Sequence, residues 1–274
     1  MSLSKFLEIS DVKAKFNSEF PKPQFQIKQQ ILAPPIFNGN PQLVGAAFDY
    51  LLRFYLKYLN PQAEERMWVA EEVVQKLKIE NKNYEPGHLV VEQAKKLYRI
   101  FLKTGEFTDE LFQVVLSLAS LDEIQRCGYT NRDLQFANQQ DVEDLKNLIG
   151  IVNSEIFKSR GKVILNPTWL SAKLVGKADG DLIFDNDLLV DFKTIKNLSL
   201  ERRDFNQLMG YYVLSHIDRL SSSNTVELKR LGIYFSRYGI LYQFNVAEVV
   251  KRETFPEFLK WFIARAQEYV SQKA

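Results

Sequence analysis

The chain has 274 residues, which is enough for one large domain or two smaller ones. Hydrophobic residues make up 46% and charged residues 26%, which is typical of a folded protein and excludes a disordered or collagen-like chain. The single cysteine, Cys127, excludes an internal disulfide and a four-thiolate zinc site. The 36 basic and 34 acidic residues leave a net charge of +2, which neither requires nor excludes a nucleic-acid partner.

The N-terminal residues lack the features of a secretory signal. Residues 1–16 carry charged side chains throughout and have no apolar stretch of the kind found in signal peptides. The most apolar segment, 111–121, has 11 residues, whereas a membrane-spanning helix needs about 20. We therefore expect a soluble cytoplasmic protein with no membrane partner.

The first half of the chain is predicted to be helical after an irregular start. Prolines at positions 21, 23, 34 and 35 indicate that residues 1–40 form an irregular lead-in. The segment 40–59 begins with Asn40 as a helix cap and Pro41 at the first helical position, and its apolar residues keep a helical period. Further helices are predicted over 61–79, 90–105, 108–128 and 139–157. We assign 1–60 to the lead-in and first core helix, and 61–157 to a helical lobe.

The sequence pattern changes after residue 160, where short runs of branched residues are bounded by turn residues. These runs predict strands, a helix, a hairpin around Arg237 and a closing helix, in the order 163–169, 177–184, 188–195, 201–217, 228–246 and 256–270. Helices followed by a strand-rich stretch that holds one helix favour an α/β or α+β core over 158–274.

The most informative segment is the predicted hairpin around the turn 185–187, which reads Asp-Asn-Asp. If the central asparagine is the middle of the turn, Leu182 pairs with Val190 and Asp181 stands opposite Asp191. Because side chains alternate along a strand, one face then carries four polar residues: Asp179, Asp181, Asp191 and Lys193.

Two carboxylates placed opposite each other repel, and a divalent cation would offset that repulsion. Mg²⁺ prefers oxygen ligands, commonly one or two carboxylates together with substrate phosphate. Lys193 could hold an attacking water or stabilise charge that develops on a phosphate. The pattern therefore suits metal-assisted phosphodiester hydrolysis. The alternative from the residues alone is that aspartates gather at turns and that Asp-x-Lys recurs by chance.

The order of these motifs resembles the PD-(D/E)XK nuclease superfamily, and most of all its RecB-type branch. That branch has an acidic residue on one strand, (D/E)xK on the next strand, and QxxxY on the following helix. The corresponding residues here are Asp181, then 191–193 (Asp-Phe-Lys), then Gln207 and Tyr211. Upstream, GAAFDYLL at 45–52 resembles the branch's helix start, with Asp49 where a histidine often stands. The resemblance covers about 45–56 and 174–216, so the stretch 61–157 is expected to be an insertion.

The resemblance implies a restriction-endonuclease-like fold, in which a mixed sheet is flanked by helices and carries an inserted helical lobe. It implies a deoxyribonuclease that depends on Mg²⁺ or Mn²⁺ and acts on DNA. The implied catalytic residues are Asp181, Asp191, Lys193 and Gln207. The implied metal ligands are Asp49, Asp181, Asp191 and the backbone carbonyl of Phe192, with Asp179 as the alternative to Asp181 in a G-x-x-D register from Gly176.

Several basic or aromatic residues flank the expected site and are candidates for nucleic-acid binding: Lys177, Lys196, Arg202, Arg203 and Tyr211, with Arg237 as a weaker one. The alternatives are a solvated surface for the basic residues, and helix packing for Tyr211. An interior glycine at position 210 predicts that this helix packs closely against the sheet. Two other functions stay open: a nucleic-acid-binding module of the same fold without catalysis, and a phosphoesterase acting on RNA or a nucleotide.

Overall fold

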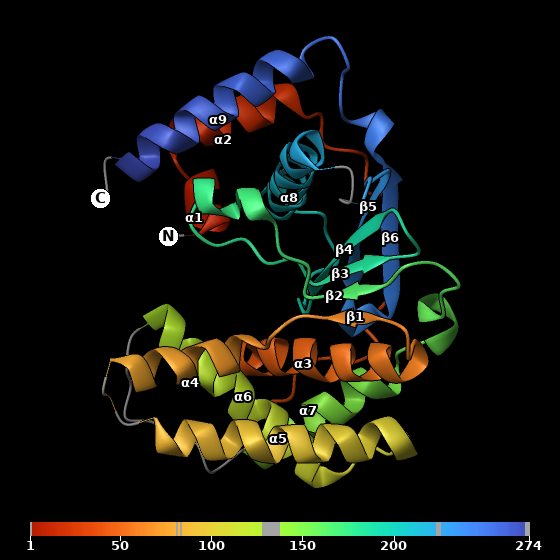
Figure 1. Ribbon diagram of the computed structural model, residues 1–274. Coiled ribbons are helices and arrows are strands. Elements are labelled where there is room, and N and C mark those ends of the chain that lie inside the picture. The colour runs from red at the N-terminus through yellow and green to blue at the C-terminus, as the bar shows by residue number, and fades with distance from the viewer. Residues whose placement is uncertain (1, 81, 83, 128–137, 223–225, 272–274) are drawn as a thin grey trace.

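The computed structural model describes residues 2–80, 82, 84–127, 138–222 and 226–271 (Figure 1). These residues form a mixed α/β fold, with a six-stranded open sheet and nine α-helices among them. The helices are α1 (Leu3–Leu7), α2 (Ser10–Glu19), α3 (Pro41–Leu59), α4 (Val69–Ile79), α5 (Glu85–Thr104), α6 (Asp109–Cys127), α7 (Gln139–Gly150), α8 (Arg202–Ser221) and α9 (Phe255–Ser271). The strands are β1 (Glu64–Glu65), β2 (Ile164–Leu165), β3 (Leu182–Phe184), β4 (Leu188–Lys193), β5 (Arg230–Phe235) and β6 (Ile240–Asn245).

The strands lie in the order β1-β2-β3-β4-β5-β6. The pairs β1–β2 and β4–β5 are parallel, and the other three neighbouring pairs are antiparallel. Because parallel strands need a crossover connection, the chain leaves β4, forms α8 and returns to β5. The strand β4 therefore lies inside the sheet, and the helix that follows it covers one face.

The predicted register of the β3–β4 hairpin is confirmed. Leu182 pairs with Val190, and the two pairs nearer the turn are Ile183 with Leu189 and Phe184 with Leu188. Asp185 and Asn186 have φ angles of 49° and 73°, which is the left-handed conformation that tight hairpin turns require and that aspartate and asparagine tolerate. The second predicted hairpin, β5–β6, also forms and turns through residues 236–239.

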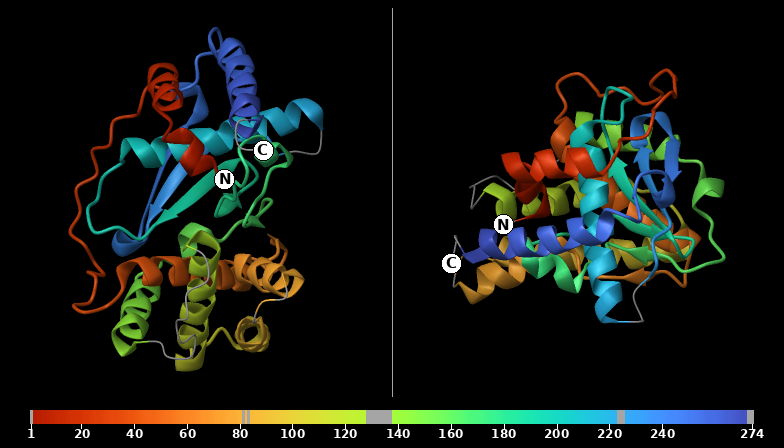
Figure 2. Two further views of the ribbon diagram at one scale, coloured as in Figure 1. Left: turned by 90° about the vertical axis from the view of Figure 1, so that its left-hand side faces the viewer. Right: turned by 90° about the horizontal axis from the view of Figure 1, so that it is seen from above.

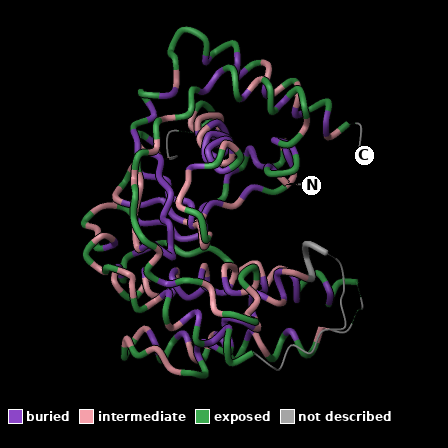
Figure 3. The backbone as a smooth tube through the Cα atoms, turned by 180° about the vertical axis from the view of Figure 1, so that it is seen from behind, coloured by how far each residue is buried: buried purple, intermediate pink, exposed green. Residues whose placement is uncertain are grey.

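The sheet separates two hydrophobic cores, because alternate residues of its strands face opposite sides. Leu182, Val190 and Phe192 face the core shared with α3 to α7, and Ile183 and Leu189 face the core shared with α1, α2, α8 and α9. The helical layers lie on either side of the sheet in Figure 2. Figure 3 shows that the strands and the inner sides of the helices are the buried parts of the chain.

The first core helix forms as the sequence predicts. Asn40 caps α3 by accepting the backbone N–H of Leu43, and Pro41 is its first residue. The helical lobe also forms, but with different helix bounds: the predicted helix 61–79 begins only at Val69, because β1 precedes it. Likewise α7 ends at Gly150 instead of 157, and a short 3-10 turn follows over 154–157. The predicted end of α6 at residue 128 lies outside the described residues.

The prediction of an irregular lead-in over 1–40 is wrong for its first half. Residues 3–19 form α1 and α2, and the side chains of Phe6, Val12 and Phe16 are fully buried. The prolines affect only the later part, which runs from α2 past the sheet to α3 (Figure 2). There the backbone N–H groups of Leu32 and Ala33 donate to the carbonyl oxygen of Arg237.

Two predicted strands are shorter than expected. Of 163–169, only Ile164–Leu165 pairs as a strand, because Asn166 takes a left-handed φ of 55° and Pro167 follows it. Of 177–184, only Leu182–Phe184 pairs as a strand. Gly210 packs closely as predicted, but its neighbour is α1 instead of the sheet. A Cβ there would lie 2.9 Å from Leu3 Cδ2. No helix within the described ranges is long and apolar enough to cross a membrane.

Candidate active site

The β3–β4 hairpin brings Asp181 next to Asp191. The strand pairing ends at Leu182 and Val190, one residue before Asp181 on one side and Asp191 on the other. The Oδ2 atom of Asp181 accepts the backbone N–H of Phe192 at 2.6 Å, so the carboxylate reaches across to β4 where β3 begins. Asp191 is 3% exposed. The charge of Asp181 raises the pKa of Asp191, so the two acidic side chains lie near each other toward the end of β4.

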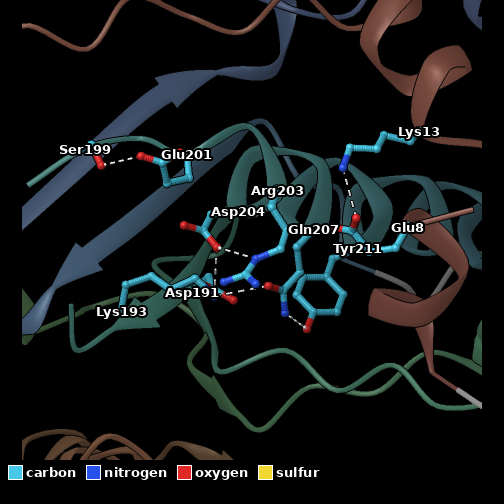
Figure 4. Close-up of polar contacts among 10 residues, drawn as sticks. All are labelled: Glu8, Lys13, Asp191, Lys193, Ser199, Glu201, Arg203, Asp204, Gln207 and Tyr211. Carbon is cyan, nitrogen blue, oxygen red and sulfur yellow. Dashed lines mark hydrogen bonds and ion pairs between the residues drawn. The ribbon is translucent and has the colours of Figure 1, made fainter. Parts of the chain in front are cut away.

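Lys193 lies among three oxygen atoms of neighbouring side chains (Figure 4). Its Nζ atom is 2.8 Å from Asp191 Oδ2 and 3.7 Å from Asp204 Oδ1, and it donates to Gln207 Oε1 at 3.1 Å. The Lys193 side chain is 18% exposed. The first turns of α8, which carry Asp204 and Gln207, thus hold the ammonium group beside Asp191.

Tyr211 fixes the orientation of Gln207. The Nε2 atom of Gln207 donates to the Tyr211 hydroxyl at 2.8 Å, so its carbonyl oxygen is the atom that faces Lys193. The Tyr211 ring stacks on Trp169, with centroids 5.0 Å apart and 19° between the planes. Tyr211 is 6% exposed, which favours its packing role over the alternative of a DNA contact.

The acidic pair is costly to ionise in the absence of a cation. Burial raises the pKa of Asp181 to about 7, and the charge of Asp49 adds to this rise. Burial also raises the pKa of Asp191 to about 7, where Lys193 opposes the rise and Asp181 adds to it. The negative charge of a neighbouring carboxylate therefore contributes to the raised pKa of each aspartate. A positive ion that binds here removes a repulsion already built into the fold.

Burial would lower the pKa of Lys193, but the carboxylates of Asp191 and Asp204 outweigh it and hold that pKa above its usual value. The side chain is therefore a permanent cation at ordinary pH. It can donate hydrogen bonds and stabilise negative charge, whereas it cannot accept a proton.

The helix α3 brings Asp49 toward the same place. A Cβ on Gly45 would lie 3.6 Å from Thr194 Cβ, so the start of α3 lies beside the end of β4. Asp49 is half-buried and close enough to raise the pKa of Asp181. The fold thus brings Asp49 near Asp181, although the two residues are far apart in the sequence.

Asp179 faces different neighbours from Asp181. It bridges to Thr168 and is half-buried, and burial together with the nearby Glu72 carboxylate raises its pKa while Lys177 lowers it. Because Asp181 accepts a backbone N–H of β4 whereas the carboxylate that most affects Asp179 is Glu72 of α4, the arrangement favours Asp181 as the partner of Asp191.

The donor atoms of this site suit a hard divalent cation. Asp191 Oδ2 is buried and, apart from the nearby ammonium of Lys193, has no hydrogen-bond partner. The oxygens of Asp181 and Asp191, with a backbone carbonyl, belong to the ligand class that Mg²⁺ and Mn²⁺ prefer. Among the described residues, no three acidic, histidine or cysteine side chains converge as a ready metal cage. A bound ion here would complete its shell with water or substrate oxygens, as Mg²⁺ usually does.

The basic candidates divide into surface and structural residues. Lys196 is exposed, and so is the side chain of Arg203, at 79%. Lys177 forms an ion pair with Glu72 at 2.7 Å. Arg202 anchors α2 to α8 instead, because its guanidinium donates to the carbonyl oxygens of residues 16 and 20. Arg202 therefore has a structural role in the first place.

The prediction that Arg237 contacts DNA is wrong. Its side chain is fully buried and forms a two-point ion pair with Asp144, at 2.8 and 2.9 Å. It also donates to the carbonyl oxygen of Ala33. The hairpin turn that carries Arg237 is covered by α7 and the extended N-terminal segment, which the sequence pattern did not indicate.

Sequence reasoning missed two charged residues of the site, Asp204 and Arg53. Asp204 stands three residues before Gln207, so helical spacing alone places both on one face of α8. Arg53 stands four residues after Asp49 on α3 and is the first cation among the influences that lower the pKa of Asp181, which burial raises. In both cases an i,i+3 or i,i+4 search around the motif residues would have found them.

Comparisons with protein-family models, with curated proteins and with solved structures found no match to this chain. The functional argument therefore depends on the residues and the geometry described above.

Proposed function

We propose that this protein is a metal-dependent deoxyribonuclease with a restriction-endonuclease-like core. One observation carries the proposal: Asp181, Asp191 and Lys193 lie together at the end of β4, and Gln207 and Tyr211 of α8 hold the lysine in place. The same four motif elements, in the same order, are what the sequence shares with RecB-type nucleases. The helical lobe 61–157 is then an insertion after the first core helix.

The residues that would hold the cation are Asp181, Asp191 and the carbonyl of Phe192, with Asp49 close by. When bound, Mg²⁺ or Mn²⁺ would polarise the phosphate and its bound water. The raised pKa values of both aspartates support this role, because they report negative charge that the protein itself leaves uncompensated.

Lys193 would act as a fixed positive charge and hydrogen-bond donor. Its pKa is held above the usual value, so it would orient the attacking water or stabilise charge on the phosphate, and would not remove a proton. Gln207 is then a positioning residue, since its carbonyl oxygen keeps the ammonium beside Asp191. Exposed cations near the site, such as Lys196 and Arg203, would contact the DNA backbone.

The test uses purified protein with labelled single-stranded DNA, duplex DNA and RNA, each with Mg²⁺, Mn²⁺ or a chelator. The variants are Asp191→Asn, which keeps side-chain size, and Lys193→Gln, which removes the positive charge. Arg99→Gln, an exposed change on α5, is the control. We expect chelator-sensitive cleavage of DNA that falls at least about 100-fold in both site variants and stays unchanged in the control.

Three results would contradict the proposal. Salt-sensitive DNA binding without cleavage would identify a binding module, and cleavage confined to RNA would identify a different phosphoesterase. Cleavage that survives in both Asp191→Asn and Lys193→Gln would place the chemistry elsewhere in the molecule.

A further inference from the structure

Arg53 is connected to the strand that leads into the acidic pair. It lies one helical turn after Asp49 on α3, and its Nε donates to the Asp49 carbonyl oxygen at 2.9 Å. Its Nη1 donates to Asn166 Oδ1 at 3.0 Å. The backbone N–H of Asn166 in turn donates to the Asp181 carbonyl oxygen at 3.0 Å. The guanidinium is thereby tied to the backbone of a candidate metal ligand.

The guanidinium also packs over the face of an aromatic ring. Its central carbon lies 4.9 Å from the centroid of the Tyr50 ring. The Tyr50 hydroxyl donates to Asp122 Oδ1 at 2.8 Å and accepts the backbone N–H of Ala70 at 3.1 Å, so the ring itself is fixed. An arginine ordered in this way loses little conformational freedom when it binds a ligand.

Arg53 lies near the carboxylates of Asp181 and Asp179, whose pKa values its charge lowers, but it forms no close ion pair among the described contacts. The ion pairs of the described residues do not include it, and both of its hydrogen-bond acceptors are neutral oxygens. The other cations of the site differ, since Lys193 lies between Asp191 and Asp204, and Lys177 is paired with Glu72. Arg53 is half-buried. It thus presents guanidinium donors, without a close ion-pair partner, to an anion that approaches the acidic pair.

We propose that Arg53 binds a backbone phosphate of the nucleic-acid substrate, on the α3 side of the acidic pair. The assignment rests on the proposed nuclease function and deepens it by naming the residue that receives the substrate's charge. A guanidinium presents its N–H groups as a planar fork that matches phosphate oxygens, and the neighbouring aspartates would otherwise repel that group. Lys193, at the end of β4, and Arg53, on α3, would then contact the substrate on two sides of Asp181 and Asp191.

The test measures DNA binding by fluorescence anisotropy at several salt concentrations, with a chelator present so that nothing is cleaved. We expect Arg53→Gln to weaken binding about 10- to 100-fold at low salt. The slope of log affinity against log salt should fall by about 1, which is the signature of one lost phosphate contact. Arg99→Gln should change neither quantity.

A second variant separates substrate binding from a structural role. Asn166→Gly removes the acceptor of Arg53 but suits the left-handed φ of 55° at that position, so the guanidinium stays while its anchor is lost. We expect this variant to keep the wild-type salt slope. A further probe is a series of DNAs, each with one neutral methylphosphonate at a different position near the cleavage point. Wild type should bind one DNA of the series more weakly than unmodified DNA, and Arg53→Gln should bind that DNA as well as it binds unmodified DNA.

An unchanged salt slope in Arg53→Gln would overturn the assignment, and so would an Asn166→Gly variant that reproduces the whole loss. If wild type cleaves DNA while Arg53→Gln keeps its slope, only the role of Arg53 fails. If wild type neither binds nor cleaves DNA, the nuclease proposal fails and takes this assignment with it.

Discussion

Asp181→Asn should stabilise the metal-free protein at pH 8. The substitution removes a charge but keeps an oxygen that can accept the backbone N–H of Phe192. Burial raises the pKa of Asp181 to about 7, so the ionised side chain is less stable in the folded protein than in the unfolded chain, whose carboxyl keeps the ordinary value of 3.8. The folded protein therefore binds this proton more tightly. Its free energy of unfolding falls as pH rises from about 4 to 7.

The size of the effect follows from that difference. The interval between 3.8 and about 7 corresponds to at most about 4 kcal/mol, and relaxation around a partly exposed carboxylate reduces it to about 1–3 kcal/mol. For a chain of 274 residues this raises Tm by about 2–5 °C. At pH 5 the carboxyl is ionised in the unfolded chain but protonated in the folded protein, so the advantage of the variant should shrink to about a third of its value at pH 8.

The measurement is thermal unfolding with a chelator at pH 5 and pH 8. Asp218→Asn is a matched control, because that buried carboxylate accepts the N–H groups of Leu170 and Ser171, and its loss should destabilise the protein at both pH values. An Asp181→Asn variant stabilised equally at both pH values, or destabilised at pH 8, would refute the reasoning about the acidic pair.

Three further predictions follow from contacts around the site and the lobe. Tyr211→Phe removes the hydroxyl that orients Gln207, so cleavage kinetics should give a kcat about tenfold lower with KM unchanged, and an equal rise in KM would point to a DNA contact instead. Arg237→Met leaves Asp144 buried without its partner and should cost about 3–5 kcal/mol in urea unfolding, whereas an unchanged midpoint would contradict its structural role. Gly210→Val should weaken docking of α1, and protease cleavage within α1 should then be faster than in wild type.

The sequence predicted best those features that local rules determine. The turn 185–187 set the hairpin register, and a cap followed by proline set the start of α3. Prolines later in the lead-in led to the prediction of irregular structure where α1 and α2 form. The apolar residues of these two helices nevertheless carry a helical period. Local rules identified Asp181 and Asp191 because alternation along two adjacent strands is enough to bring them together.

The remaining features depend on contacts between distant segments. Arg237 looked like an exposed turn residue, and only the docking of α7 supplies Asp144 and buries it. The cation of Arg53 reaches the site because α3 packs on the sheet beside β2 and β4, which no spacing within either segment encodes. Such partners are fixed by tertiary packing, although the i,i+4 spacing from Asp49 is a local signal for Arg53.

The crossover from β4 through α8 has a consequence for the order in which the site loses structure. Asp181, Asp191, Lys193 and Gln207 all lie within 27 consecutive residues, so one hairpin and one helix preserve their arrangement. Asp49 joins them only while α3 stays docked. Amide hydrogen exchange should therefore report two separable opening events, and the slower one should protect the hairpin together with α8.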